Sequence, residues 1–296
     1  IPLRLVGSEM CIRDSIRFKH FKKTYDENIL DIKGGLNDVV MNNSPIDIDK
    51  LIEGTNEILT ANRNSLQLFD MLHSMRQFDD LTYVHSVNVA LIASILGQWL
   101  KFSEKDIRIL TISGLLHDIG KIMIPNEILT KPGKLTVAEY NIMKQHVNFG
   151  YEKVKNQNID IRIKEACLLH HEKCDGTGYP FGLKSDHIPA VAKIIAIADV
   201  YDAMTSARVY RGALCPFEVI DTMYKDAFTK FEPEYILPFL KNVASSYINN
   251  DVRLSDGRIG KVVLINENAL SLPIVQCEDE FIDLSKTREL TVSAIL

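Results

Sequence analysis

The sequence predicts a mainly α-helical protein with a small β-rich module at its C-terminal end. Apolar residues recur at helical spacing from about Asp47 to Ser246, with polar residues between them. After Ser246 the pattern changes to short β-branched runs separated by turn residues. With 296 residues, 46% of them hydrophobic, and a mean hydropathy of −0.01, the chain can bury a substantial core.

The predicted organisation has four parts. Residues 5–15 look like translated adapter sequence, so the start of the chain is treated as a non-native leader rather than as part of the fold. The expected parts are this leader, an N-terminal helical segment, the main helical domain and the β module, at 1–15, 16–75, 76–246 and 247–296.

The first predicted helices precede residue 101. Apolar residues in 47–75 fit one long helix or two short ones, and 82–100 fits a further helix. On that further helix His85 lies on the same face as Val89 and Ile92, at spacings of four and seven residues. Because these two neighbours are apolar, His85 is predicted to face the interior.

Capping residues set the limits of the next helices. Ser103 is a predicted N-cap, and the helix it begins ends near His117. Thr136 and Glu139 have capping-box spacing, which predicts a helix carrying His146 about three turns in. Two of the histidines are thereby placed on or at the end of helices.

Two more helices follow before the β module. Asp160 is a predicted N-cap, and Pro189 opens a helix at a position that does not need its missing N–H. On this helix Asp199, Asp202 and Ser206 follow at spacings of three and four residues and share one face. Strands are predicted beyond it at 258–265, 272–277 and 280–284.

Composition excludes several classes of protein. A net charge of −5 argues against binding a nucleic acid polymer, so a phosphate ligand would need local basic groups. The longest nearly apolar stretch, 89–100, is shorter than the roughly 20 residues of a membrane-spanning helix. The 5 cysteines form no CxxC pair, which favours a reducing, cytoplasmic setting over a disulfide or zinc-thiolate framework.

Three motifs combine histidines with carboxylates within about eighty residues. They are His117-Asp118-Ile119-Gly120-Lys121, the run from His170-His171-Glu172 through Asp175-Gly176-Thr177-Gly178-Tyr179-Pro180, and Ala198-Asp199-Val200-Tyr201-Asp202-Ala203. Imidazole and carboxylate groups converging from several helices suit divalent metal ions. Adjacent helical residues point about 100° apart, so His170 and His171 could act together only if the helix broke there.

In this order the motifs resemble those of the HD-GYP family of cyclic-di-GMP phosphodiesterases, from roughly Asp79 to Tyr210. The resemblance implies an all-α HD-domain bundle that hydrolyses cyclic-di-GMP to the linear dinucleotide, and on toward GMP, with a metal-bridging hydroxide. Two divalent ions are implied, with iron or manganese suiting such ligands better than magnesium. The implied ligands are His85, His117, Asp118 and Asp199 for the first ion, and the bridging Asp118, His146, His170 and His171 for the second.

The same resemblance assigns the substrate contacts. Lys121 would contact a phosphate and stabilise charge in the reaction beside the catalytic Asp118. Glycines in the loop allow close backbone approach to a ligand. The implied binding residues are Lys121, Asp175, Gly176, Gly178, Tyr179, Pro180, Arg208 and Arg211, with Asp202 as a guanine or outer-sphere partner. Leu81 stands where some relatives carry a glutamate ligand, which favours two metal ions over three.

Alternatives stay open at this level. A catalytically silent cyclic-dinucleotide receptor would be expected to lack ligands, whereas all seven candidates are present. A phosphohydrolase for another cyclic dinucleotide, such as cyclic GMP-AMP, would differ in base contacts that the sequence does not reveal. Family analogy adds diguanylate-cyclase-type or sensory proteins as partners, and the sequence leaves a homodimer open.

Overall fold

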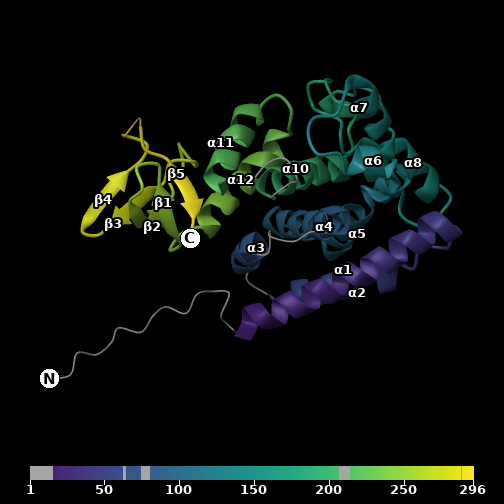
Figure 1. Ribbon diagram of the computed structural model, residues 1–296, viewed down its shortest axis with the longest axis horizontal. Helices are drawn as coiled ribbons and strands as arrows, with labels where there is room; N and C mark the ends of the chain where they lie inside the picture. Colours follow the sequence, from purple (N-terminus) through teal and green to yellow (C-terminus); the bar gives the residue numbers. More distant parts are fainter. Residues whose placement is uncertain (1–15, 63–64, 75–80, 207–213, 288) are drawn as a thin grey trace.

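The computed structural model describes residues 16–62, 65–74, 81–206, 214–287 and 289–296. Helices come first and a small antiparallel sheet comes last, so the predicted fold class is confirmed. Along the longest axis of the molecule the sheet lies at one end and helices α6 to α8 lie at the other (Figure 1).

The N-terminal helices are α1 (Ile16–Asn42), α2 (Ile48–Ala61) and α3 (Ser65–Ser74). The stretch 47–75 therefore contains two short helices, one of the two predicted arrangements. Asp47 caps α2 by accepting a hydrogen bond from the Lys50 N–H. Helix α1 runs along one side of the central helices (Figure 1) and buries Phe18, Phe21 and Tyr25 on one face.

The central helices form the core that carries the three motifs. Helix α4 is apolar around most of its circumference and is buried over most of its length, as expected for the middle of a bundle. Ser103 caps α5 as predicted, and His117 is its C-cap. The elements of this part are α4 (Leu81–Trp99), α5 (Glu104–Leu116), the 3-10 turn η2 (Ile119–Met123), α6 (Asn126–Leu129), α7 (Val137–Met143), α8 (His146–Val154), α9 (Ile161–Leu169), η3 (Ser185–His187) and α10 (Ala190–Thr205).

The prediction that His146 lies deep inside one helix is wrong. The capping box of Thr136 and Glu139 is present, but the helix it begins, α7, ends at Met143. A tight turn follows, in which the Gln145 N–H donates to the Ile142 carbonyl, and His146 opens α8. His146 therefore belongs to α8 rather than to α7, and its side chain is buried.

Helices α11 (Pro216–Asp226) and α12 (Pro233–Ser246) lead into the sheet. Its strands are β1 (Asp251–Leu254), β2 (Ile259–Leu264), β3 (Ile274–Cys277), β4 (Glu280–Asp283) and β5 (Val292–Ile295), in the order β4-β3-β2-β1-β5. The three predicted strands are confirmed, whereas β1 and β5 were missed. They pair with each other, Val252 opposite Ile295.

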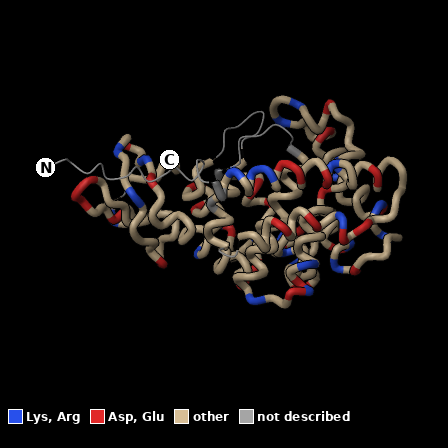
Figure 2. Tube along the Cα trace, turned by 90° about the horizontal axis from the view of Figure 1, so that it is seen from below, with Lys and Arg blue, Asp and Glu red and all other residues tan. Residues whose placement is uncertain are grey.

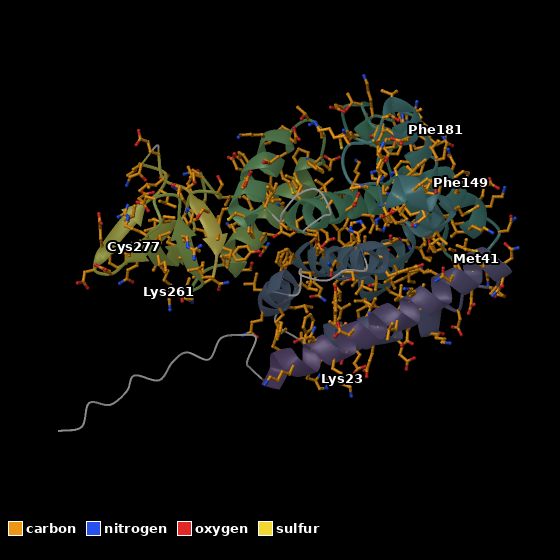
Figure 3. All side chains as sticks on the ribbon, in the orientation of Figure 1. Lys23, Met41, Phe149, Phe181, Lys261 and Cys277 are labelled. Carbon is orange, nitrogen blue, oxygen red and sulfur yellow. The ribbon has the colours of Figure 1, made fainter. Side chains whose placement is uncertain are left out.

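Acidic and basic residues are interspersed along the described chain, with no long run of one sign (Figure 2). Lys23 on α1 and Lys261 on β2 point outward from the ribbon (Figure 3). Within the described ranges no helix has both the length and the apolar character needed to cross a bilayer.

Candidate metal centre

Asp118 lies at the centre of the candidate site. It follows the C-cap of α5 and is 1% exposed. Its Oδ2 lies 3.2 Å from Nε2 of His117 and 3.5 Å from Nε2 of His85. Its Oδ1 lies 3.3 Å from Nε2 of His146 and 3.7 Å from Nε2 of His170. Each carboxylate oxygen therefore faces a different pair of imidazoles, as a bridging ligand would.

The orientation of these imidazoles is fixed from behind. Nδ1 of His117 lies 2.8 Å from the Gly114 carbonyl, and Nδ1 of His146 lies 2.7 Å from the Met143 carbonyl. Nδ1 of His170 lies 2.9 Å from a carbonyl one turn earlier in α9, that of Ala166. A carbonyl only accepts, so each Nδ1 carries the hydrogen and each Nε2 presents its lone pair to Asp118.

His85 is held in the same way by a carboxylate. Its Nδ1 lies 2.7 Å from Oδ2 of Asp202, and its Nε2 lies 3.0 Å from Oδ1 of Asp199. Asp199 and Asp202 are one turn apart on α10 and share the predicted face. Asp202 thus contacts the ring nitrogen of His85 that faces away from Asp118. Of the two roles expected for Asp202, this contact corresponds to the outer-sphere partner rather than to the guanine contact.

Two groups of side chains each have donor atoms within 4.8 Å of one another. One contains His85, His117 and Asp199, and the other contains Asp118, His146, His170 and His171. Helix α9 ends at Leu169, so the helix breaks where the joint use of His170 and His171 required it. The structure therefore brings together all seven residues that the sequence singled out.

The electrostatics of the cluster reflect burial among opposite charges. Burial lowers the pKa of His146 to about 3, and it also lowers the pKa values of His117 and His171. For His85 burial acts downward, but the adjacent carboxylates of Asp199 and Asp202 outweigh it and raise the pKa to about 9. Burial acts upward on Asp118, yet the neighbouring imidazole of His117 and the Lys121 ammonium keep its pKa well below the usual range.

The donor set fits divalent metal ions. Buried Nε2 atoms of His85 and His117 and Oδ1 of Asp118 have no hydrogen-bond partner among the described residues. Leaving such groups without a partner costs about 1–3 kcal/mol each, so they are rarely left so without a reason. Lone pairs of several imidazoles and two carboxylates aimed at a common space are the arrangement a cation requires.

Lys121 and the glycine-rich loop border the cluster. The Lys121 ammonium forms an ion pair with Oδ2 of Asp118. The Tyr179 ring stacks on the His171 ring with centroids 4.7 Å apart and an interplanar angle of 26°. Gly178 is required for a close approach, because an added Cβ would lie 2.4 Å from the Lys173 nitrogen. Asp175 is exposed and accepts hydrogen bonds from Thr177, so it shapes the loop.

Glu172 has a role that the sequence analysis missed. It is 4% exposed, and its two carboxylate oxygens accept hydrogen bonds from the Phe181 and Leu183 N–H groups, at 2.7 and 2.9 Å. These bonds close the loop that contains Gly176, Gly178, Tyr179 and Pro180. The only signal in the sequence was the position of Glu172 directly after the two histidines. Phe181 itself is 63% exposed at the surface (Figure 3).

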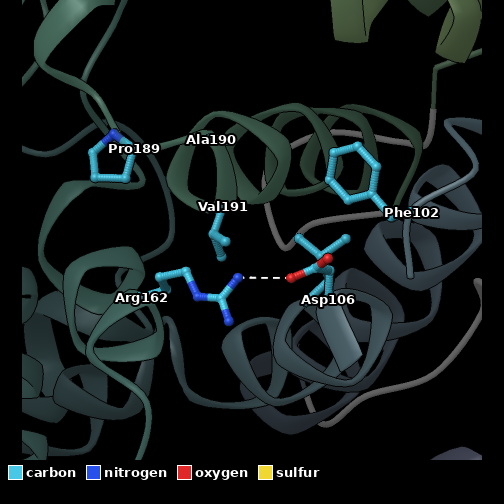
Figure 4. Close-up of a pocket in the computed structure, with 7 residues that line it drawn as sticks. Phe102, Asp106, Arg162, Pro189, Ala190 and Val191 are labelled. Atoms are coloured by element: carbon cyan, nitrogen blue, oxygen red, sulfur yellow. Dashed lines mark hydrogen bonds and ion pairs between the residues drawn. The ribbon is translucent and has the colours of Figure 1, made fainter. Parts of the chain in front are cut away.

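Arg208 and Arg211, two of the expected substrate contacts, fall outside the residues that the structure describes. A cavity of about 110 Å³ between α5, α9 and α10 is lined mainly by apolar groups, and its charged members, Arg162 and Asp106, pair with each other at 2.7 Å (Figure 4). None of the seven candidate ligands lines it.

The helical fold and the two adjoining histidine and carboxylate clusters define an α-helical domain with a candidate metal centre. The family model described as "HD domain" matches residues 53–235, and the chain belongs to this family. It is 36% identical over 203 residues to a protein named cyclic di-GMP phosphodiesterase from Pseudomonas aeruginosa, a match that covers 68% of this chain and 49% of that protein.

Two further similarities bear on substrate and fold. A protein named 3'3'-cGAMP-specific phosphodiesterase 2 from Vibrio cholerae is 32% identical over 227 residues, covering 75% of this chain and 42% of its own. A solved structure described as an HDG"Y"P protein from Bdellovibrio bacteriovorus superposes with a TM-score of 0.62 at 17% identity, over 78% of this chain and 73% of that one, and shows the shared fold. The chain spans about half the length of the first of these relatives.

Proposed function

We propose that the chain is a metal-dependent phosphodiesterase that hydrolyses cyclic-di-GMP to linear pGpG, and on toward GMP. The observation that carries this proposal is the position of Asp118, whose two oxygens face two different pairs of imidazoles at 3.2–3.7 Å. The family membership and the names of the relatives support the same activity.

The proposed ligands divide as the two clusters do. His85, His117, Asp118 and Asp199 would hold one ion, and Asp118, His146, His170 and His171 would hold the other. Iron or manganese suits this mixture of imidazoles and carboxylates. Ions held there would supply Lewis-acid polarisation of the phosphodiester and activation of water as the nucleophile.

The chain's own groups would orient and stabilise the substrate. The Lys121 ammonium, already beside Asp118, is placed to balance charge on the non-bridging phosphate oxygens. The Tyr179 ring, stacked on His171, presents a flat surface next to the cluster for a sugar or base. Arg208 and Arg211 are proposed nucleotide contacts on the grounds of the resemblance in sequence alone.

The test is turnover of cyclic-di-GMP by anaerobically purified protein loaded with Fe²⁺ or Mn²⁺, with the products separated by chromatography. Asp118→Ala is expected to abolish turnover and to lower the metal content below two ions per chain. Asp186→Ala, the same change at an exposed aspartate in η3, is the matched control and should keep both.

The other outcomes separate the rival functions. Faster turnover of 3'3'-cGAMP than of cyclic-di-GMP would replace the substrate, a rival that the Vibrio relative's name favours. Binding of intact cyclic-di-GMP by the metal-loaded protein, without turnover, would make it a receptor. If the metal-loaded protein neither binds nor hydrolyses either nucleotide, the proposal is overturned.

A further inference from the structure

A chain of buried hydrogen bonds connects helix α1 to the candidate metal centre. The Tyr25 hydroxyl donates to Oδ1 of Asn88, and Nδ2 of Asn88 donates to Oδ1 of Asp202 at 2.9 Å. The other oxygen of Asp202 lies 2.7 Å from Nδ1 of His85. Tyr25, Asn88, Asp202 and His85 are 2%, 3%, 1% and 7% exposed, so water does not compete for these bonds.

Each bond in this chain fixes the direction of the next. A carboxylate only accepts, so Asp202 takes hydrogen from both His85 Nδ1 and the Asn88 amide. The Asn88 NH₂ group therefore faces Asp202, and the amide oxygen faces Tyr25. The Tyr25 hydroxyl donates to this buried oxygen and so holds Asn88 in the position that supports Asp202.

The consequence reaches a proposed ligand. With Nδ1 held by Asp202, Nε2 of His85 is directed at Asp118 and Asp199, at 3.5 and 3.0 Å. Outer groups that hold a ligating histidine in this way commonly change metal affinity about 10–100-fold when they are removed. Helix α1 lies before the region matched by the family model, 53–235, so this support comes from outside the matched domain.

We propose that Tyr25 is a positioning residue for the metal centre: from helix α1 it orients, through Asn88 and Asp202, the imidazole of His85. This inference rests on the proposed function only in taking His85 as a metal ligand. Tyr25 lies on α1, and Asn88 and His85 are one turn apart on α4. The packing of α1 against α4 would therefore affect metal binding.

The test is the dissociation constant for Mn²⁺, measured by calorimetry on the full chain for the wild type, Tyr25→Phe and Asn88→Ala. Tyr83→Phe is the matched control, because it removes another tyrosine hydroxyl that bridges α4 and α1, to Oδ1 of Asn37 at 3.2 Å. Tyr83 is not a member of the hydrogen-bond chain from Tyr25 to His85. Tyr25→Phe should weaken Mn²⁺ binding about 5-fold or more and Asn88→Ala about 10–100-fold. Tyr83→Phe should stay within about twofold of the wild type.

The outcomes keep this inference separate from the proposed function. If the wild type binds no Mn²⁺, the metal centre itself is wrong. If the wild type binds Mn²⁺ but Tyr25→Phe matches it, the positioning role is overturned and the metal centre stands. Equal weakening by Tyr25→Phe and Tyr83→Phe would also overturn it, because general loosening of α1 would then explain both.

Discussion

Replacing Glu172 by glutamine tests how the loop beside the cluster is held. The carboxylate accepts from two backbone N–H groups, those of Phe181 and Leu183, in a buried position. Glutamine has nearly the same size but only one acceptor oxygen, so its NH₂ group must face one of the two N–H donors. The change therefore removes one charge-assisted bond and turns an NH₂ group toward one partly buried N–H donor.

The expected cost follows from these two losses. A hydrogen bond to a charged group contributes about 1.5–3 kcal/mol, and a donor left unsatisfied costs up to about 1–3 kcal/mol, less where water reaches it. Because both figures describe overlapping effects, we expect the free energy of unfolding to fall by about 3 kcal/mol. With about 2–4 °C per kcal/mol for large domains, the Tm should fall by roughly 6–12 °C.

Thermal unfolding followed by circular dichroism measures this shift. Glu152→Gln makes the same chemical change at a side chain that is 61% exposed and pairs only with Lys155 at the surface. Such a pair contributes about 0–1 kcal/mol, so the control should change the Tm by no more than about 4 °C. A fall for Glu172→Gln no larger than that of the control would refute the argument that Glu172 holds the loop closed.

Three other perturbations have defined outcomes. Gly120→Ala should destabilise the fold by about 3 kcal/mol in urea unfolding, because the new Cβ would lie 1.9 Å from the His146 carbonyl oxygen. Bound Mn²⁺ should raise the stability of the fold: at about 100 times its Kd it should stabilise the wild type by about 2.7 kcal/mol, and EDTA should reverse this. Asp118→Ala should show no such shift in a thermal melt. The pKa of Glu139 is lowered to about 2 by Lys131 and by the Thr136 cap, so its contribution to stability is full above about pH 4.5 and is lost as the pH falls toward 2.

Matched measurements test the predictions for Gly120 and Glu139. Gly34→Ala, in an exposed part of α1 where an added Cβ meets nothing within 4 Å, should stabilise the protein by about 0.5–1 kcal/mol, and a loss equal to that of Gly120→Ala would contradict the steric argument. For Glu139, urea unfolding of the wild type and Glu139→Gln at pH 6 and pH 3 should differ more at pH 6. A difference that grows on acidification would reverse the sign of the argument.

Much of the candidate site could be predicted from the sequence because its residues stand at positions with local signals. His117 is the C-cap of a helix that Ser103 begins, and Asp199 and Asp202 share a helical face by spacing alone. The motifs then supplied the association between distant residues through their resemblance to a family. The strands β2, β3 and β4 were also predictable, because turn residues separate short runs rich in β-branched residues there.

Local signals failed where a neighbour distant in sequence decides the structure. No glycine or proline marks the turn that ends α7 before His146, and β1 and β5 are four-residue strands that find each other across the whole module. Tyr25 and Asn88 are 63 residues apart, and nothing in either segment indicates the other. The sequence by itself indicated which side chains could bind metal and, for His85, His117 and Asp199, the helix on which or at whose end they lie. Only the tertiary structure decided which buried acceptor orients each imidazole, because that depends on how the helices pack against one another.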